Sequence, residues 1–393
     1  MGDSIAFWKD LMNHPNYDAW WEARNARNFV SNIKPAMLVV GGTFDAEDCF
    51  GAWSLYKAIE EKSKNTDNRL VMGPWYHGGW AGDKGMHLGN VRFGKKTSEY
   101  YQRNIEIPFF NFYLKLKGTV RDIAEATVFF TGENEWRRFN EWPAKNVNPT
   151  SALLTYRNLI AIAGNTNVEP VQLKGTNTTD AGYSEYISDP AHPVPYTEDI
   201  GLRRTREYMI DDQRFASRRT DVLTFNTGVL TEDLTLAGPI IADLMVSIST
   251  TDADFVVKLI DVFPDEFSYP ADNSFPPGRS GGAVYPMGGY QMLVRGEIMR
   301  GRYRYSFEKP EAFVPGKITQ VKYTLPDVAH TFKKGHKLMI QIQSSWFPLA
   351  DRNPQKFVDI YKCDDSDFQK ATIKIYHDGV NASKIVLPVL KNQ

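Results

Sequence analysis

The sequence predicts an α/β fold in the first part of the chain and an all-β fold in the remainder. Residues 3–116 alternate between helical patterns and two short, mainly apolar runs at 36–40 and 69–73. From about residue 121, short apolar segments are separated by Gly, Pro, Asn and Asp. A chain of 393 residues is also too long for one compact core. We therefore predict two domains, 1–120 and 121–393.

The α/β elements follow from apolar spacing and from helix start signals. An unbroken apolar run such as 36–40 is typical of a parallel strand that is buried on both faces. Pro15 suits the first position of a helix, and Pro108 predicts a kink. In chain order we expect helices at 3–12 and 15–30, a strand at 36–40, a helix at 52–62, a strand at 69–73 and a helix at 97–118.

The second domain has the pattern of an antiparallel β-sandwich or jelly roll, because many short strands follow one another between turn residues. A polar, loop-like excursion at 155–220 interrupts it. The expected strands lie at 125–132, 221–228, 236–250, 254–263, 290–304, 316–325, 336–345 and 371–378.

Charge and cysteine usage exclude several classes of partner. The formal net charge is -1 with both signs dispersed, which argues against nucleic acid or an anionic membrane. No apolar run approaches the length of a membrane-spanning helix, and no signal-peptide pattern follows Met1. Cys49 and Cys363 lie far apart and offer neither a disulfide framework nor a zinc or redox spacing. We expect no metal and no cofactor.

Two residues are candidates for catalysis because each follows a predicted buried strand. Asp45 comes after the first strand and His77 after the second. Chemistry in open α/β sheets gathers at the carboxyl ends of strands, so the two side chains can meet. An aspartate that orients a histidine is part of a Ser-His-Asp system, and acid before histidine is the order of the α/β-hydrolase fold. The alternatives are a helix cap or turn for Asp45 and a surface loop for His77.

The segments GGTFDAEDCFGAW at 41–53 and LVMGPWYHGGW at 70–80 resemble the CocE/NonD acyl esterase superfamily, which includes the X-Pro dipeptidyl-peptidases. Within it, the chain most resembles the α-amino acid ester hydrolases, also known as glutaryl-7-aminocephalosporanic acid acylases. Residues 7–25 are similar to the end of that family's helical cap, and 211–265 and 328–354 to its C-terminal domain. The resemblance implies the C-terminal part of an α/β-hydrolase domain followed by a jelly-roll β-sandwich.

The resemblance also assigns roles to four residues. It implies that Asp45 is the triad acid, that His77 is the triad base, and that Glu47 and Asp48 belong to a carboxylate cluster that binds the α-ammonium group of the substrate. An ammonium group that leaves water needs anionic acceptors, which clustered carboxylates supply. The alternative is that Glu47 and Asp48 open the following helix, where acids favour the helix dipole.

The nucleophile of this family, the serine of a G-x-S-Y-x-G motif, does not occur before Asp45. The motif GRSGG around Ser280 matches G-x-S-x-G, but it lies between prolines and glycines, after His77, in the sandwich half. A working nucleophile turn needs a strand before it and a helix after it, so we reject Ser280. We expect that this chain is the C-terminal portion of a longer hydrolase and is inactive alone.

Other residues are weaker candidates. His330 and His336 lack a third metal ligand, so a turn and a strand are favoured over a zinc site. Residues 364–367 (DDSD) suggest a solvated turn rather than a calcium loop. Three tryptophans are candidates for the lining of an acyl pocket, with core packing as the alternative: Trp75, Trp80 and Trp346.

The function predicted from these features is a serine hydrolase of α-amino acid esters or amides. An X-Pro dipeptidyl-peptidase or a general acyl esterase is the alternative within the enzymes. A non-catalytic glycan-binding or assembly module is the alternative from another class. The resemblance implies homo-oligomers, without fixing the number of subunits, and implies export to the periplasm or beyond if a signal peptide precedes this sequence.

Overall fold

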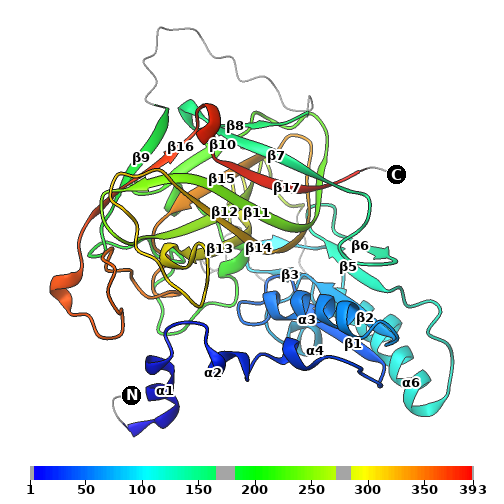
Figure 1. The fold of residues 1–393 in the computed structure, drawn as a ribbon. Coiled ribbons are helices and arrows are strands. Elements are labelled where there is room, and N and C mark those ends of the chain that lie inside the picture. The colour runs from blue at the N-terminus through cyan, green and yellow to red at the C-terminus, as the bar shows by residue number, and fades with distance from the viewer. Residues whose placement is uncertain (1–3, 165–181, 271–284, 392–393) are drawn as a thin grey trace.

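The computed structural model describes residues 4–164, 182–270 and 285–391. Two sheets dominate it: a four-stranded sheet in the α/β part and an eleven-stranded sheet formed by the remainder. In Figure 1 the α/β part, blue to cyan, lies below the large sheet, and both ends of the chain lie at the periphery. The mixed α/β class with mostly β-strands agrees with the prediction. The jelly-roll arrangement of the second domain stays a prediction.

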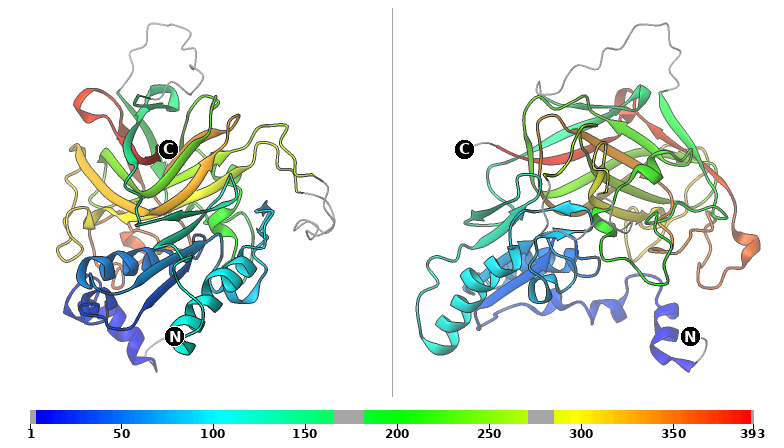
Figure 2. Two further views of the ribbon diagram at one scale, coloured as in Figure 1. Left: turned by 90° about the vertical axis from the view of Figure 1, so that its right-hand side faces the viewer. Right: turned by 180° about the vertical axis from the view of Figure 1, so that it is seen from behind.

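The four-stranded sheet has the order β1-β2-β5-β6. β1 and β2 are parallel, as are β2 and β5, so their carboxyl ends lie at one edge of the sheet. α3 packs on one face and α5 with α6 on the other, as Figure 2 shows from the side. The elements are β1 (Met37–Gly42), α3 (Cys49–Lys62), β2 (Asn68–Gly73), α5 (Thr97–Tyr101), α6 (Ile107–Lys115), β5 (Ala126–Phe130) and β6 (Glu135–Phe139).

The placement of one predicted strand was wrong. We expected 125–132 to open the sandwich, but β5 pairs with β2 and β6 in the first sheet. All of β5 is buried, as is usual for a strand covered on both faces, and the short apolar run alone does not reveal which sheet takes it. The division into 1–120 and 121–393 remains a prediction.

One predicted helix differs from the structure, and the helix predicted at 97–118 is present over 97–115 with a π-helical segment inside it. The expected helix at 15–30 was wrong over most of its length, because only Ala19–Glu22 is α-helical and Ala26–Phe29 forms a 3-10 turn. Asp18 caps α2 by accepting a hydrogen bond from the Trp20 amide at 3.0 Å. Before Pro108 the chain forms a π-helical segment, so the proline falls in the first turn of α6, where its missing N–H costs little. The N-terminal elements are α1 (Ala6–Asn13), α2 (Ala19–Glu22) and η2 (Ala26–Phe29), and the π-helical segment is η3 (Gln102–Glu106).

The eleven-stranded sheet contains the other strands predicted for the second domain. Its core is formed by apolar residues that alternate along long strands, of which β11 and β14 pair over most of their length. Its strands are β7 (Val147–Thr155), β8 (Leu159–Ile162), β9 (Tyr183–Ser188), β10 (Leu223–Asn226), β11 (Leu234–Ile248), β12 (Asp254–Val262), β13 (Gln291–Arg300), β14 (Thr319–Phe332), β15 (Lys337–Gln343), β16 (Ala371–Tyr376) and β17 (Lys384–Leu390).

Short elements complete the described part. None of its helices has both the length and the apolar character needed to cross a membrane. Residues 364–367 form a capped turn, as predicted. The remaining elements are α4 (Gly79–Gly82), β3 (His87–Leu88), β4 (Val91–Arg92), η4 (Tyr156–Asn158), η5 (Tyr208–Ile210), α7 (Arg214–Ser217), η6 (Gly301–Tyr303), η7 (Asp365–Asp367) and η8 (Gly379–Asn381).

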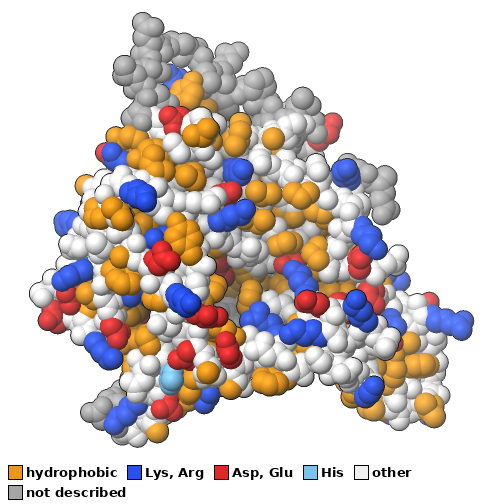
Figure 3. All heavy atoms as spheres, in the orientation of Figure 1, with side chains coloured by type: hydrophobic (Ala, Val, Ile, Leu, Met, Phe, Trp, Pro, Cys, Tyr) orange, Lys and Arg blue, Asp and Glu red, His pale blue; other side chains and the backbone are white. Residues whose placement is uncertain are grey.

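The face of the molecule in Figure 3 has dispersed charge and an apolar patch over α6. On this face, Lys and Arg side chains are interspersed with Asp and Glu. Apolar side chains gather over α6, at the lower right. Ile107, Phe110 and Leu114 follow one side of that helix and are 46–74% exposed.

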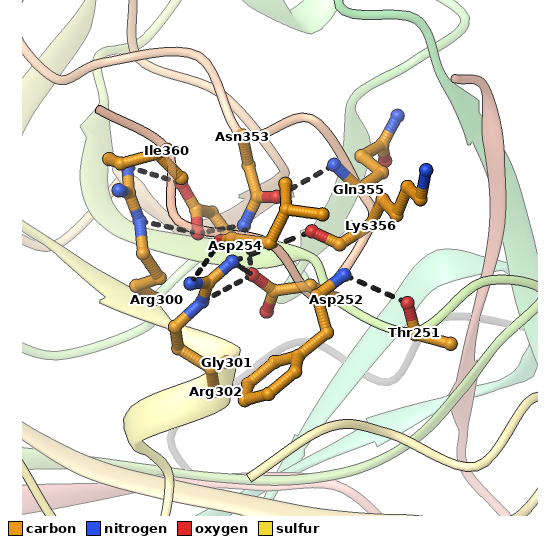
Figure 4. Close-up of polar contacts among 12 residues, drawn as sticks. Thr251, Asp252, Asp254, Arg300, Gly301, Arg302, Asn353, Gln355, Lys356 and Ile360 are labelled. Atoms are coloured by element: carbon orange, nitrogen blue, oxygen red, sulfur yellow. Dashed lines mark hydrogen bonds and ion pairs between the residues drawn. The ribbon is translucent and has the colours of Figure 1, made fainter. Parts of the chain in front are cut away.

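A buried ionic network fastens the loop after β15 to the sheet (Figure 4). Asp252 is fully buried and accepts hydrogen bonds from Arg302 Nε at 2.7 Å and from Asn353 Nδ2 at 3.1 Å. Asp254 accepts from the same amide at 2.7 Å and pairs with Arg300 at 3.3 Å. Burial raises the pKa of Asp252 and the charge of Arg302 opposes that rise. Opposite charges therefore compensate one another in the buried part of this network.

His330 lies on β14 and His336 follows the turn before β15, where a strand and a turn were predicted, and both histidines flank one carboxylate. Asp261 lies between them, 3.1 Å from His330 Nε2 and 2.8 Å from His336 Nδ1. Burial raises the pKa of Asp261, but the hydrogen bonds from the two histidines outweigh it and hold the pKa below its usual value. His330 also lies 2.7 Å from Thr131 Oγ1, just past β5, and so joins the two sheets.

Lys258 is a fully buried lysine of β12. Its Nζ donates to Gln213 Oε1 at 3.0 Å and lies 5.3 Å from the centre of the Trp346 ring. Burial lowers the pKa of Lys258 to about 7. The folded protein therefore holds this amine in an environment that disfavours its charge.

Lys258→Met is expected to stabilise the protein below pH 7 by a few kcal/mol, because it removes the cost of burying a charge. The native pKa of about 7 lies below the unfolded value of 10.5, so the unfolded chain binds more protons between these values. The free energy of unfolding of the wild type therefore rises with pH between about 7 and 10.5. The Lys258→Met variant lacks this dependence on pH. Urea unfolding at pH 6, 8 and 10 measures both effects. Lys322→Met, at an exposed position, should keep the wild-type slope; the same slope in Lys258→Met would contradict the assignment.

Candidate active site

The loop after β1 holds Asp45 in a fixed, buried position. Thr43 N donates to the Gly73 carbonyl at 2.7 Å and Phe44 N to the Trp75 carbonyl at 3.1 Å, which ties this loop to the end of β2. A Cβ on Gly42 would lie 2.2 Å from the Trp75 carbonyl oxygen, so only glycine permits this approach. Asp45 is 1% exposed, at the carboxyl edge of the sheet where it was expected.

Asp45 and His77 contact each other across the two strand ends. His77 Nδ1 lies 3.1 Å from Asp45 Oδ2 and 3.3 Å from Oδ1. A carboxylate only accepts hydrogen bonds, so Nδ1 carries the proton and Nε2 is the basic nitrogen. Asp45 Oδ1 also accepts from the amides of Glu47 at 2.8 Å and Asp48 at 3.0 Å. The side chain of His77 is half exposed, and Gly78, with φ 74°, turns the chain directly after it.

The structure separates the two neighbouring acids. Asp48 Oδ2 lies 3.4 Å from His77 Nδ1, and this carboxylate is 67% exposed. Glu47 pairs instead with Arg204, which comes from the loop between β9 and β10. The hydrogen bond and charge of Arg204, with a contribution from His77, hold the pKa of Glu47 below its usual value. Asp45, Asp48 and His77 are thus brought together, whereas Glu47 is engaged by a guanidinium group.

This geometry suits proton transfer better than metal binding. The ligand atoms of Asp45, Asp48 and His77 lie within 4.8 Å of one another, a spacing that also fits an ion. However, the Asp45–His77 contact already uses His77 Nδ1 and the Asp45 carboxylate, and Asp45 Oδ1 accepts from two backbone amides as well. A buried carboxylate that fixes one ring nitrogen leaves the other as a general base.

Two family models cover most of the chain. The X-Pro dipeptidyl-peptidase (S15 family) model matches residues 2–79, and the model of the X-Pro dipeptidyl-peptidase C-terminal non-catalytic domain matches residues 118–386. The chain belongs to the CocE/NonD superfamily. This confirms the resemblance seen in the sequence, and the relatives in this superfamily are serine hydrolases.

Three relatives within the CocE/NonD superfamily cover nearly the whole chain. An aminopeptidase from a marine sediment Thaumarchaeota archaeon is 34% identical with a TM-score of 0.86, over 99% of this chain and 61% of its own. An α-amino acid ester hydrolase is 35% identical with a TM-score of 0.84, over 98% and 61%. Cocaine esterase from Rhodococcus sp. is 28% identical, over 97% of this chain and 61% of its own. The chain thus spans about three fifths of the length of these relatives.

Other predicted positions in this CocE/NonD chain lie outside the Asp45–His77 contact. Trp75 and Trp346 are 2% and 5% exposed and pack in apolar clusters, so core packing holds for both. Trp80 is half-buried beside Trp75, with their ring centres 6.1 Å apart. Ser280 lies outside the described residues. No local pattern pointed to Arg204, because it contacts Glu47 from 157 positions away in the chain.

Proposed function

We propose that this chain supplies the acid and base of a serine hydrolase that cleaves esters or amides of α-amino acids. The observation that carries the proposal is the contact between buried Asp45 and half-exposed His77 at the ends of two parallel strands. Within the superfamily, the α-amino acid ester hydrolase and the aminopeptidase have names that refer to amino-acyl substrates. The experiment that tests it is Asp45→Asn in a chimera with the Thaumarchaeota aminopeptidase, which should lose most of its hydrolysis of an α-amino acid ester.

In the proposed mechanism the hydroxyl of a serine attacks the acyl carbon while His77 Nε2 takes its proton. Asp45 keeps the proton of the ring on Nδ1 and stabilises the imidazolium that forms. His77 then returns the proton to the leaving alkoxide or amine, and the reverse sequence with water releases the acid. No serine of this chain is assigned as the nucleophile, so we propose that this chain alone is inactive.

The substrate ammonium group would be bound by Asp48 and Glu47. Asp48 is exposed beside the imidazole and offers an acceptor to a cation near the reacting carbon. Glu47 is also half exposed, and an ammonium group would share it with Arg204 or displace that residue. The contacts of Asp48 therefore support the ammonium role more directly than those of Glu47.

Activity can be measured in a chimera in which this chain replaces the matching 61% of the Thaumarchaeota aminopeptidase. In it, the double variant Glu47→Gln/Asp48→Asn is expected to lower kcat/KM for an α-amino acid ester about tenfold to hundredfold, because charged hydrogen bonds to the ammonium group are lost. The ester of the same acid without its amino group should be hydrolysed as before.

Glu61→Gln, at an exposed acid near the end of α3, is the matched control and should change neither rate. Equal losses for both esters in the double variant would refute the ammonium role. That outcome would leave Asp45 and His77 as the catalytic pair.

An X-Pro dipeptidyl-peptidase is the alternative within the superfamily, and the two family models favour it. A Gly-Pro chromogenic amide and an α-amino acid ester, offered to the same chimera, separate the two. Faster cleavage of the Gly-Pro amide would select the peptidase.

A non-catalytic glycan-binding module is favoured by one observation, a hollow of about 650 Å³ between the N-terminal helices and the loops of the large sheet. Aromatic side chains of this kind stack on sugar rings, and charged groups beside them accept and donate hydrogen bonds. Binding of this chain to a glycan array would support that function. The lining includes Trp8, Tyr17, Trp21, Tyr303, Phe347, Asp351, Arg352 and Tyr361.

A further inference from the structure

Arg295 reaches from the large sheet to the loop that carries Asp45. It lies on β13 and is 1% exposed. Its Nη1 donates to the Thr43 carbonyl at 2.8 Å and lies 3.3 Å from Cys49 Sγ. Thr43 stands two positions before Asp45, and Cys49 is the first residue of α3. The guanidinium group therefore joins the end of β1 to the start of the next helix.

The Thr43 carbonyl accepts its hydrogen bonds from Arg295 and Cys49, not from β2. The amides of Thr43 and Phe44 donate to β2 and to the residues after it, so they fix the loop from the sheet side. The Thr43 carbonyl is held by Arg295 and, at 3.5 Å, by the thiol of Cys49. A thiol is a weak donor, so Arg295 supplies most of this restraint.

A purely structural role explains Arg295 poorly. Burying a guanidinium group costs several kcal/mol unless it is paired, and an apolar residue of similar size usually packs as well. Among the described residues, Arg295 has no partner for Nε or Nη2. Burial raises the pKa of Glu297 and the charge of Arg295 opposes that rise, but no ion pair joins the two side chains in the described part of the chain. A costly group whose hydrogen bond ends on the Asp45 loop points to a role in the site.

We propose that Arg295 is a positioning residue, through which the large sheet sets the Asp45–His77 pair. This inference rests on the proposed function. Arg295 holds the Thr43 carbonyl, the carbonyl fixes the direction of the chain at Asp45, and Asp45 keeps the His77 proton on Nδ1. The C-terminal domain thus takes part in forming the acid–base pair.

The test is the tautomer of the His77 ring, measured by two-bond ¹H–¹⁵N NMR on the 393-residue chain with labelled histidine. The signal of His77 is assigned by its loss in His77→Gln. Wild type is expected to show the Nδ1–H form. Arg295→Met should lose it in favour of a mixture with Nε2–H, and Arg295→Lys, which can still donate to the Thr43 carbonyl, should restore it.

Two controls separate the possible failures. Lys258→Met replaces another buried cation, on the neighbouring strand, and should keep the Nδ1–H form. If Arg295→Met keeps the Nδ1–H form, or if Lys258→Met loses it to the same extent, Arg295 is not a positioning residue. Either result would leave the Asp45–His77 pair and the proposed function intact. Asp45→Asn must shift the tautomer; if it does not, the pair and the proposed function fail, and this inference fails with them.

Discussion

Asp45→Asn in the chimera with the Thaumarchaeota aminopeptidase is expected to lower kcat by about three to four orders of magnitude. An amide in this position can donate to His77 Nδ1 and so favours the wrong tautomer of the ring. It also no longer stabilises the imidazolium. The side chains have nearly equal size, and the amides of Glu47 and Asp48 can still donate to the remaining oxygen, so the loop should keep its shape.

The measurement for Asp45→Asn is the hydrolysis of an α-amino acid ester by purified chimera, with unfolding followed in parallel. Asp122→Asn, at an exposed position of the α/β part, is the control and should retain full activity. A folded Asp45→Asn variant with activity within tenfold of the unchanged chimera would show that Asp45 does not orient the base.

Asp252→Ala is expected to destabilise the protein by about 3–5 kcal/mol, because it leaves the buried Arg302 without its carboxylate. The amide of Asn353 loses an acceptor as well, and the loop after β15 loses its anchor (Figure 4). Urea unfolding of the 393-residue chain at pH 7 measures this loss.

Glu185→Ala is the matched control for Asp252→Ala. Its carboxylate is 53% exposed and lies 3.8 Å from Lys374, so its removal should cost less than about 1 kcal/mol. Similar losses in both variants would mean that the Asp252 network contributes no more than a surface ion pair.

The sequence was sufficient for the parts of the fold and site that depend on local pattern. The run at 37–40 and the acid that follows it predicted a buried parallel strand and a polar residue at its carboxyl end. The same reasoning at 69–73 placed His77, and two parallel strands in register then bring both side chains to one edge. Superfamily membership followed from motifs in these same segments.

The sequence was insufficient where the contacts are distant. β5 is a short apolar run whose pattern fits either sheet, and only its pairing with β2 decides its place. Arg295 contacts Thr43 across 252 positions, so no local spacing could reveal that the large sheet reaches the candidate site. The pairing of Glu47 with Arg204 was missed for the same reason and changes which acid is free to bind a cation.

Fluorophosphonate labelling of the chimera, with and without His77, tests the central claim most directly. We predict that the label maps to a serine from the aminopeptidase part, and that His77→Ala slows labelling by about three orders of magnitude. Labelling at the same rate without His77, or on Ser280, would contradict the claim that Asp45 and His77 are the acid and base of a serine hydrolase.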